Sequence, residues 1–395
     1  MPSAGRPGGV HPPANHASTL PMKITGLTTR LLEIDPAPRY QDGKIPAGRP
    51  KVWRFPLITL QTDEGVEGYS MAYAPHGDGV AIAETLANVY LPELVGEDPR
   101  NSEAIWQKLY RKQRHLYNQT DTLLGAIDVA IWDIRGKALG KPIVDLLGRY
   151  RDRMPCYASA RSETYSAEEF VREARQMQAA GFHGYKLQVR EGAQADVPRL
   201  RAVREAVGPD FPLMQDPNGM YDYDEALRVG RALDELNYLW FEEPLRDQRL
   251  LLLRRLQQNI RTPLLVGETL RFAEQHLALH DGAFSLVRGD TMYTAGITGL
   301  RKLMAAAEVA GINCEIHTAC TPLIDVANLH VACATANTRF IENHHPIFRF
   351  GVKNDPLEPD ARGYVTVPGA PGLGVQLDWD WIENHTARLS SSAQR

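Results

Sequence analysis

The sequence has no apolar run long enough to cross a membrane. A membrane-spanning helix needs about 20 consecutive apolar residues, and the best candidate here, residues 123–134, is interrupted by Asp128 and Asp133. The apolar stretch of a signal peptide is also missing, because residues 1–21 are rich in Pro, Gly, Ala and His. We therefore expect no membrane partner, and we expect residues 1–21 to form a disordered extension.

An excess of charge of one sign is missing as well. The 44 basic and 48 acidic residues leave a net charge of -4, whereas nucleic acids and anionic membranes require a basic face. A nucleic-acid partner is therefore not expected. The four cysteines show no CxxC spacing, which favours reduced thiols and a cytoplasmic protein; they are Cys156, Cys314, Cys320 and Cys333.

The first third of the chain combines strands and helices. Residues 23–74 contain apolar residues that alternate as in β-strands, and the intervening residues 36–52 hold four prolines and two glycines, the composition of a loop. Residues 80–148 are helical in pattern and include the amphipathic stretch 121–140, which Gly140 ends. This part predicts an α+β unit.

After about Pro155 short apolar strands alternate with helices. In one unit, residues 183–189 form a strand, a helix with Asp196 as its N-cap ends at Gly208, and residues 211–216 form the next strand. Similar pairs follow to the end of this region. Such alternation predicts a parallel sheet, and the number of units favours a closed barrel. A doubly wound open sheet is the alternative, but the GxGxxG turn typical of that fold is missing.

Each predicted strand ends at or near a residue capable of chemistry. These residues follow one another at intervals of 22 to 30 positions, one per strand–helix unit. The C-terminal ends of barrel strands converge on one mouth, where active sites lie. We therefore expect one pocket to contain Lys186, Asp216, Glu242, Glu268, Asp290, His317 and Glu342.

A single carboxylate at a strand end is most often a helix cap or a surface charge. Here, however, reactive residues recur at the same place in successive strand–helix units, which favours a shared site. Carboxylates brought together without a cation repel each other, and Mg²⁺ binds a few carboxylates together with water and substrate. Zinc is less favoured, because the three central positions offer neither His nor Cys. The sequence predicts Mg²⁺ on Asp216, Glu242 and Glu268. On adjacent strands, Asp290 can orient His317 as a general base.

The motifs at these positions resemble those of the mandelate racemase subgroup of the enolase superfamily, from Met22 to about Ile382. The matching segments are AIDVAIWDIRGKALGKPIVDLLG (126–148), DPNGMYD (216–222), WFEEPL (240–245), LLVGET (264–269) and GDTMYTAGITG (289–299). The resemblance implies a modified (β/α)₇β barrel, residues 151–354, with an N-terminal α+β capping domain, residues 22–150. Residues 355–395 would return to the cap, and a symmetric homo-oligomer is expected.

The resemblance also assigns roles. It implies that Asp216, Glu242 and Glu268 bind Mg²⁺, that His317 and Asp290 form a base dyad, and that Lys186 stabilises the negative charge of an enediolate. Glu342, in its protonated form, would donate a hydrogen bond to the substrate carboxylate, whereas Glu243 would pair structurally. The loop at residues 36–52 would close over the far end of the substrate. Asn218 and Ser159 fall where such enzymes often contact substrate, and further substrate contacts are expected from Gln188, Tyr157, His344 and Arg54. For Arg54 and the other basic residues of the cap, the alternatives are contact with an anionic substrate and plain solvated charge, which is the more common outcome at such positions; these other residues are Arg39, Lys44, Arg49 and Lys51.

One departure from the family pattern guides the predicted reaction. The family has KxK on the second barrel strand, and this chain has Lys186-Leu187-Gln188. Because Gln188 cannot accept a proton, racemisation is disfavoured, and one base is enough for dehydration of an acid sugar to a 2-keto-3-deoxy acid. The sequence does not decide which acid assists the leaving hydroxyl. The candidates are His317 itself, His344, His345, Tyr157 and a loop residue. A cycloisomerase or epimerase and a non-catalytic acid-sugar binder are the alternatives.

Overall fold

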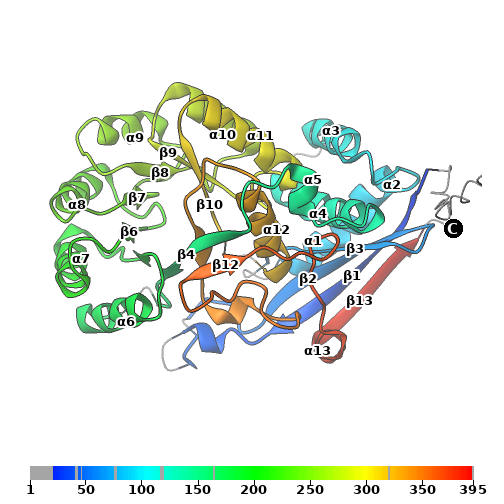
Figure 1. The fold of residues 1–395 in the computed structure, drawn as a ribbon, viewed down its shortest axis with the longest axis horizontal. Helices are drawn as coiled ribbons and strands as arrows, with labels where there is room; N and C mark the ends of the chain where they lie inside the picture. Colours follow the sequence, from blue (N-terminus) through cyan, green and yellow to red (C-terminus); the bar gives the residue numbers. More distant parts are fainter. Residues whose placement is uncertain are drawn as a thin grey trace, which may run out of the picture.

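The computed structural model describes residues 21–40, 43–45, 47–74, 78–115, 120–162, 165–318 and 321–393. The predicted disordered extension at residues 1–21 lies outside the described residues except for its last residue, and Cys320 also lies outside them. Two bodies pack together, an antiparallel sheet with its helices and a barrel of parallel strands (Figure 1). Among the described residues, no helix is both long and apolar enough to cross a membrane.

The antiparallel sheet joins both ends of the described chain. Its strand order is β13-β1-β2-β3, with β1 Ile24–Ile34, β2 Trp53–Thr62, β3 Glu67–Met71 and β13 Thr386–Ala393. The last strand pairs with the first, from Gly26 opposite Ala393 to Leu32 opposite Thr386, and the two lie side by side in red and blue in Figure 1. The C-terminal segment thus completes a sheet begun by the N-terminal segment.

One short helix, η1, lies between β1 and β2, and the other helices of this part of the chain lie between β3 and the barrel. In chain order they are η1 Ala37–Arg39, α1 Gly79–Thr85, η3 Leu86–Tyr90, α2 Leu91–Leu94, α3 Ser102–Lys112, η4 Gln113–His115, α4 Asp121–Ala138 and α5 Ile143–Leu147. Helix α4 is buried on nearly all sides, because it packs between β3 and barrel helix α11. Within it, buried Asp128 accepts hydrogen bonds from the backbone N–H and the hydroxyl of Thr298 at the start of α11. This contact positions the capping sheet on the barrel.

Eight parallel strands form a nearly closed barrel, in the order β10-β9-β8-β7-β6-β5-β4-β11. They are β4 Arg153–Ser159, β5 Tyr185–Leu187, β6 Leu213–Gln215, β7 Trp240–Glu242, β8 Leu264–Val266, β9 Leu286–Gly289, β10 Asn313–Ile316 and β11 Ile341–Asn343. The connecting helices are α6 Ala167–Ala179, α7 Ala193–Val207, α8 Tyr223–Glu235, α9 Leu250–Gln257, α10 Phe272–Asp281, α11 Gly296–Val309 and α12 Pro322–Cys333. The predicted (β/α)₇β barrel is confirmed, and the open doubly wound sheet is excluded.

The chain leaves the barrel through short elements, η5 Pro346–Phe348, β12 Tyr364–Thr366 and α13 Trp379–His385. Strand β12 adds antiparallel to β4. One local prediction needs correction: α7 begins at Ala193, so Asp196 lies inside the helix, where its carboxylate accepts from the Gly192 N–H and the Tyr221 hydroxyl. The predicted end at Gly208 is confirmed by its positive φ of 84°, which glycine adopts without strain.

A small apolar cluster fills the barrel below its mouth. It consists of Tyr157, Met214, Trp240, Leu265 and Leu286. Because side chains alternate along a strand, residues two positions further on, such as Glu242 after Trp240, face the same interior at a higher level. The apolar floor therefore supports a polar layer at the C-terminal ends of the strands.

Candidate active site

A buried lysine lies at the centre of the polar layer. The Nζ atom of Lys186 is 3.3 Å from Asp216 Oδ2, 3.1 Å from Glu242 Oε2 and 2.9 Å from Glu342 Oε1. All four side chains are at most 2% exposed. Strand β5 therefore places one ammonium group among carboxylates from β7, β11 and the end of β6, and mutual attraction offsets the cost of burying these charges.

Arg288 adds a second buried cation that the sequence analysis missed. Its terminal nitrogen donates to Glu342 Oε2 at 2.7 Å and to the hydroxyl of Tyr157 at 3.1 Å. Its Nε lies 2.8 Å from Glu242 Oε1, as an ion pair without hydrogen-bond geometry. A signal was present in the sequence, since Arg288 stands two positions before Asp290 on β9 and must face the same side of the strand.

The charges around Glu342 correct one prediction. Burial raises the pKa of this carboxyl, but Lys186 and Arg288 outweigh burial and hold the pKa well below its usual range. Oε1 forms an ion pair with Lys186, and Oε2 forms one with Arg288. Glu342 is therefore an ionised acceptor here and not the protonated donor that the sequence analysis expected.

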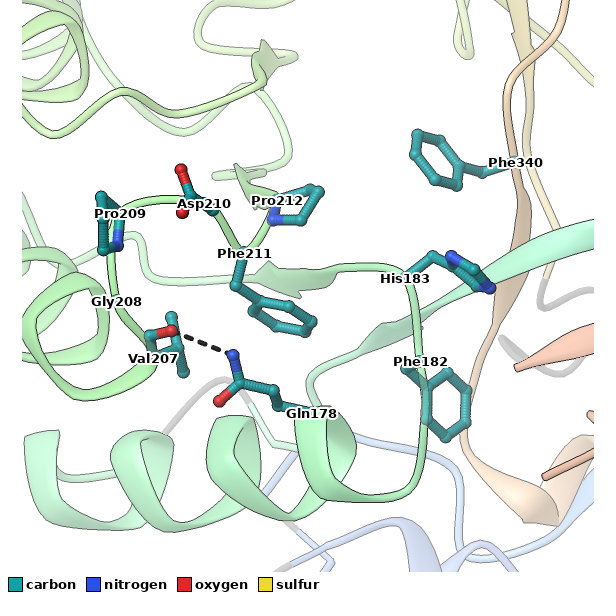
Figure 2. Close-up of a pocket in the computed structure, with 10 residues that line it drawn as sticks. All are labelled: Gln178, Phe182, His183, Val207, Gly208, Pro209, Asp210, Phe211, Pro212 and Phe340. Carbon is teal, nitrogen blue, oxygen red and sulfur yellow. Dashed lines mark hydrogen bonds between the residues drawn. The ribbon is translucent and has the colours of Figure 1, made fainter. Parts of the chain in front are cut away.

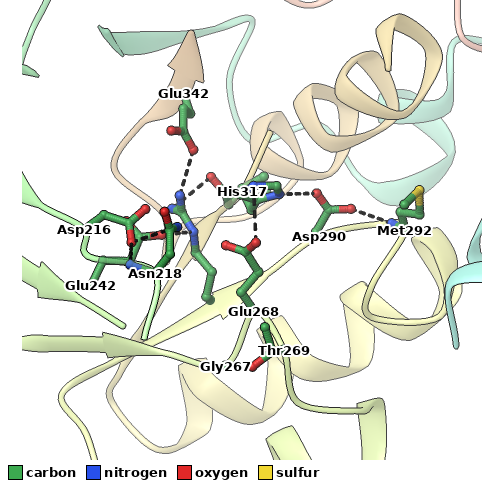
Figure 3. Close-up of polar contacts among 12 residues, drawn as sticks. Asp216, Asn218, Glu242, Gly267, Glu268, Thr269, Asp290, Met292, His317 and Glu342 are labelled. Atoms are coloured by element: carbon green, nitrogen blue, oxygen red, sulfur yellow. Dashed lines mark hydrogen bonds and ion pairs between the residues drawn. The ribbon is translucent and has the colours of Figure 1, made fainter. Parts of the chain in front are cut away.

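His317 and Asp290 form a close pair on the opposite side of the mouth (Figure 3). His317 Nδ1 is 2.8 Å from Asp290 Oδ2, and Asp290 Oδ1 accepts from the Met292 N–H at 2.6 Å. The side-chain amide of Asn328 donates to the His317 carbonyl at 2.9 Å and to Asp290 Oδ2 at 3.3 Å. This network orients the imidazole so that its Nε2 faces the mouth.

Glu268 completes the histidine side. Its Oε1 lies 3.7 Å from His317 Nε2. Burial lowers the pKa of His317, but the carboxylates of Glu268 and then Asp290 outweigh burial and raise the pKa to about 9. The position of Glu268 is held through its neighbours, because Asp247 Oδ2 accepts from the N–H groups of Gly267 and Thr269.

The carboxylates have the donor chemistry of a magnesium site. Burial raises the pKa of Glu243 well above its usual range, and Glu268, Asp247 and Asp216 raise it further, so acidic groups from β6, β7 and β8 are near enough to repel one another. Among the described residues, however, no three His, Cys, Asp or Glu side chains are close enough to hold a metal ion as they stand. The Lys186 ammonium occupies the position between Asp216 and Glu242. The donor set fits a hard cation once these side chains turn toward it.

Three of the expected substrate contacts lie at the mouth. Asn218 donates through its backbone and side-chain nitrogens to Asp216 Oδ1, at 2.9 and 3.1 Å. Gln188 is half-buried, two positions after Lys186 on the same face of the chain. Ser159 is buried at the end of β4, and none of the described residues forms a hydrogen bond with its hydroxyl.

Two expected contacts do not lie at the mouth. Tyr157 is 1% exposed, and its ring packs edge-on to Trp240 in the floor, so it supports Arg288 from below. Arg54 is exposed and forms a 2.6 Å ion pair with Glu33 on the neighbouring strand of the capping sheet. On β2 it alternates with the buried Trp53 and Phe55, so its side chain faces away from the core that they join.

His344 lies beside the mouth and is uncharged. Its Nδ1 accepts from the His345 N–H at 2.7 Å, and its ring lies against Phe348. Burial lowers the pKa of His344 well below its usual range, and Arg39 lowers it further. His344 can therefore offer a hydrogen bond to a substrate but no charge.

A separate pocket opens at the other end of the barrel (Figure 2). It has a volume of about 610 Å³ and lies where β5, β6 and β11 begin, lined among others by Phe182, His183, Asp210, Phe211 and Phe340. The His183 ring is engaged with the Arg362 carbonyl at 2.9 Å. Barrel enzymes use the opposite, C-terminal face, and none of the strand-end residues described above lines this pocket. The polar mouth is therefore the candidate site.

Comparison with known proteins supports this assignment. Residues 43–148 match the N-terminal domain of the mandelate racemase / muconate lactonizing enzyme family, and residues 169–381 match the enolase C-terminal domain-like family. D-galactarolactone cycloisomerase of Agrobacterium fabrum is 30% identical over 91% of this chain and 97% of its own. Arabinonate dehydratase of Saccharolobus solfataricus is 32% identical over 80% and 87%.

A solved structure of a dehydratase is also similar to this chain in fold and sequence. D-glucarate dehydratase from Agrobacterium tumefaciens, complexed with magnesium, superimposes with a TM-score of 0.83 at 30% identity and covers 93% of this chain and 99% of its own. A capped barrel with its reactive side chains at the C-terminal mouth thus defines the class of protein. The chain belongs to the mandelate racemase subgroup of the enolase superfamily.

Proposed function

We propose that this protein is a Mg²⁺-dependent dehydratase that converts an acid sugar to a 2-keto-3-deoxy acid. The observation that carries the proposal is the His317–Asp290 pair facing the cluster of Lys186 and the carboxylates across the mouth. Gln188 stands where a second base would be needed for racemisation, so one base acts on one face of the substrate.

The chain supplies a base and a positive field. His317 Nε2 would take the proton next to the substrate carboxylate, while Asp290 holds the other ring nitrogen and stabilises the imidazolium that forms. Lys186 would donate to a substrate oxygen on which negative charge develops. His317 can then return its proton to the β-hydroxyl, which leaves as water, and the enol becomes the keto acid.

Asp216, Glu242 and Glu268 would hold Mg²⁺, which supplies positive charge that lowers the energy of an enediolate. The magnesium complex of the D-glucarate dehydratase neighbour supports this cofactor. A test independent of turnover is calorimetric titration with Mg²⁺. Binding to the wild type and its loss in Asp216→Asn are expected, with Asp210→Asn, at the other end of the barrel, as the matched control.

The reaction is tested with a panel of aldonates and aldarates in the presence of Mg²⁺, with detection of 2-keto acids. We expect turnover of at least one acid, abolished in His317→Asn. Keto acid formed equally by the mutant would contradict the role of His317, and silence across the whole panel despite bound Mg²⁺ would overturn dehydration.

A cycloisomerase is the second candidate, because the relative matched over 91% of this chain is one. It would use the same proton abstraction and open or close a lactone ring without loss of water. NMR in D₂O separates the two reactions: solvent deuterium in recovered substrate or in an isomer, without keto acid, favours the cycloisomerase.

A further inference from the structure

The turn between β9 and α11, residues 290–296, carries the acid of the base dyad. It folds back on itself, because the Thr294 N–H donates to the Asp290 carbonyl at 2.8 Å. The Met292 N–H of the same turn donates to Asp290 Oδ1 at 2.6 Å, and Figure 3 shows this contact beside the pair with His317. The direction of the Asp290 carboxylate therefore depends on where this turn lies.

Helix α11 begins at the end of this turn without a side-chain cap of its own. Its N-cap residue is Ala295, whose methyl group cannot accept a hydrogen bond. Ala295 also lies in the left-handed region, with a φ of 56°. A non-glycine residue in this region is strained and keeps its conformation where the surrounding structure holds it. Contacts from elsewhere in the chain therefore hold the start of α11.

Asp128 of α4 provides the cap that Ala295 does not. Its carboxylate accepts from the Thr298 N–H at 2.9 Å and from the Thr298 hydroxyl at 2.8 Å. Thr298 is the third residue of α11, and an N-cap side chain ordinarily binds the N–H at this position. Gly296 permits the close approach, because a Cβ there would collide with the Asp128 carboxylate. A side chain from outside the barrel thus caps a barrel helix.

Three further contacts hold the turn itself, and all come from the part of the chain before the barrel. The Trp106 indole on α3 donates to the Ala295 carbonyl at 2.6 Å. The Tyr73 N–H, just after β3, donates to Met292 Sδ at 3.3 Å. Gly125 brings the α4 backbone directly against the turn, because a Cβ there would collide with the Met292 carbonyl. The turn is therefore supported from the side of the capping sheet.

On the barrel side, Asn328 of α12 holds the same turn. Its Oδ1 accepts from the Thr291 N–H at 2.8 Å, and its amide nitrogen donates to Asp290 and to the His317 carbonyl. Asn328 therefore acts on the pair directly, whereas Asp128 reaches the pair only through the turn. The alternative to a role of Asp128 is that Asn328 alone fixes the pair.

We propose that Asp128 is a positioning residue for the His317–Asp290 pair. By capping α11 it fixes the turn 290–296, and with it the direction from which Asp290 meets the imidazole. The expected effect on turnover rests on the proposed function, because it assumes that His317 transfers a proton. The orientation of the pair does not depend on the reaction, so the two parts can be tested separately.

The test variant is Asp128→Ala, and Asp133→Ala is its matched control. Both carboxylates lie on α4, are 1% exposed and accept from backbone N–H groups of other elements. Those that donate to Asp133 belong to Tyr69 and Leu373, not to α11. Asp128→Asn is the conservative variant, because its side-chain oxygen can still accept from the Thr298 N–H. Denaturant unfolding establishes first that each variant is folded.

Two readouts separate the orientation of the pair from a general loss of stability. The first is the NMR shift of the His317 Nδ1 nitrogen, which reports the hydrogen bond to Asp290 and is assigned by its loss in His317→Asn. The second is the split between kcat and KM for the acid sugar that the substrate panel identifies, measured in the presence of Mg²⁺.

We expect Asp128→Ala to change the Nδ1 shift and to lower kcat about 10- to 100-fold, with KM within about twofold. Asp128→Asn should recover most of the kcat, and Asp133→Ala should keep the wild-type shift and kcat. If Asp128→Ala does not fold, Thr298→Val replaces it, because this variant removes one of the two contacts and keeps the carboxylate. Its change in the Nδ1 shift should be smaller and in the same direction.

The outcomes separate this inference from the proposed function. A folded Asp128→Ala with an unchanged Nδ1 shift would overturn the inference, whatever its kcat, and would leave the proposed function standing. Equal changes in Asp128→Ala and Asp133→Ala would also overturn it, because they would reflect a general loosening of α4. A changed Nδ1 shift in Asp128→Ala alone, with no keto acid formed by the wild type from any acid of the panel, would keep the positioning role and overturn the reaction.

Discussion

The two sides of the mouth differ in how their charges are held. On the lysine side, Lys186 and Arg288 are at most 2% exposed and each contacts several carboxylates. On the histidine side, the His317 and Glu268 side chains are 14% and 18% exposed and lie 3.7 Å apart. A buried, multiply paired network is rigid and costly to break, whereas accessible groups can meet a substrate. The lysine side supplies a permanent field, and the histidine side supplies the proton transfer.

The largest effect is expected from Lys186→Met. Glu242 and Glu342 keep Arg288 as a buried cation, whereas Asp216 loses its ion pair with Lys186. Removal of one partner of a buried ion pair costs about 3–5 kcal/mol. Denaturant unfolding should show this loss, together with loss of turnover. The exposed Arg54→Gln is the control and should stay within about 0.5 kcal/mol. An unchanged unfolding midpoint for Lys186→Met would show that the network is not a stabilising unit.

Asp290→Asn is expected to act on the rate and little on stability. The amide keeps the shape of the side chain but cannot stabilise a protonated His317, so kcat should fall about 100- to 10,000-fold. The pKa of His317 should also fall below its value of about 9. Steady-state kinetics and NMR titration of the imidazole measure both quantities. A normal kcat together with a lowered pKa of His317 would show that Asp290 does not assist proton transfer by His317.

Arg288→Lys sharpens the comparison within the lysine side. Lysine keeps the charge but lacks the forked geometry, so the contact of Nε with Glu242 and the contact of the terminal nitrogen with Glu342 cannot both be kept. We expect a loss of about 1–3 kcal/mol in unfolding free energy. Thr29→Val removes a buried hydroxyl from the capping sheet, and we expect it to lower the free energy of unfolding by less than Arg288→Lys does. Equal stability of Arg288→Lys and the wild type would mean that charge alone supports the network.

The smallest effect is a pH shift in the metal-free protein. His317 has a pKa of about 9, above the ordinary value of about 6.5. Its protonated form therefore stabilises the fold fully below about pH 6.5, and this contribution is lost as the pH rises through about 9. Glu268→Gln removes the largest cause that raises this pKa, so it should move the imidazole titration down toward 6.5.

NMR of the His317 ring measures the shift, with Glu274→Gln on α10 as a control for the loss of an acid. Bound Mg²⁺ on Glu268 should move the pKa in the same direction, because it neutralises the same charge. A titration near pH 9 in both the variant and the wild type would contradict the assigned cause.

The order of elements was predictable because it depends on local patterns. Alternation of strands and helices has a short period that a sequence displays directly, and the series from Lys186 to Glu342 marked the C-terminal strand ends before the structure placed them at one mouth. Arg288 was missed because it lies inside a strand and not at its end. Tyr157 was wrongly assigned to the mouth. Its depth depends on which layer of the barrel interior its side chain enters, and the sequence does not give that layer.

The sequence by itself determined the barrel, the α+β unit that precedes it and the kinds of reactive residue at each strand end, because chain-local periodicity and spacing specify these features. The tertiary structure alone decided which charges meet. It paired both oxygens of Glu342 with cations, turned Arg54 toward Glu33 and brought Arg39 to the backbone carbonyl of Arg161. Ionisation and direction depend on neighbours that are far away in the chain, and only folding brings these neighbours together.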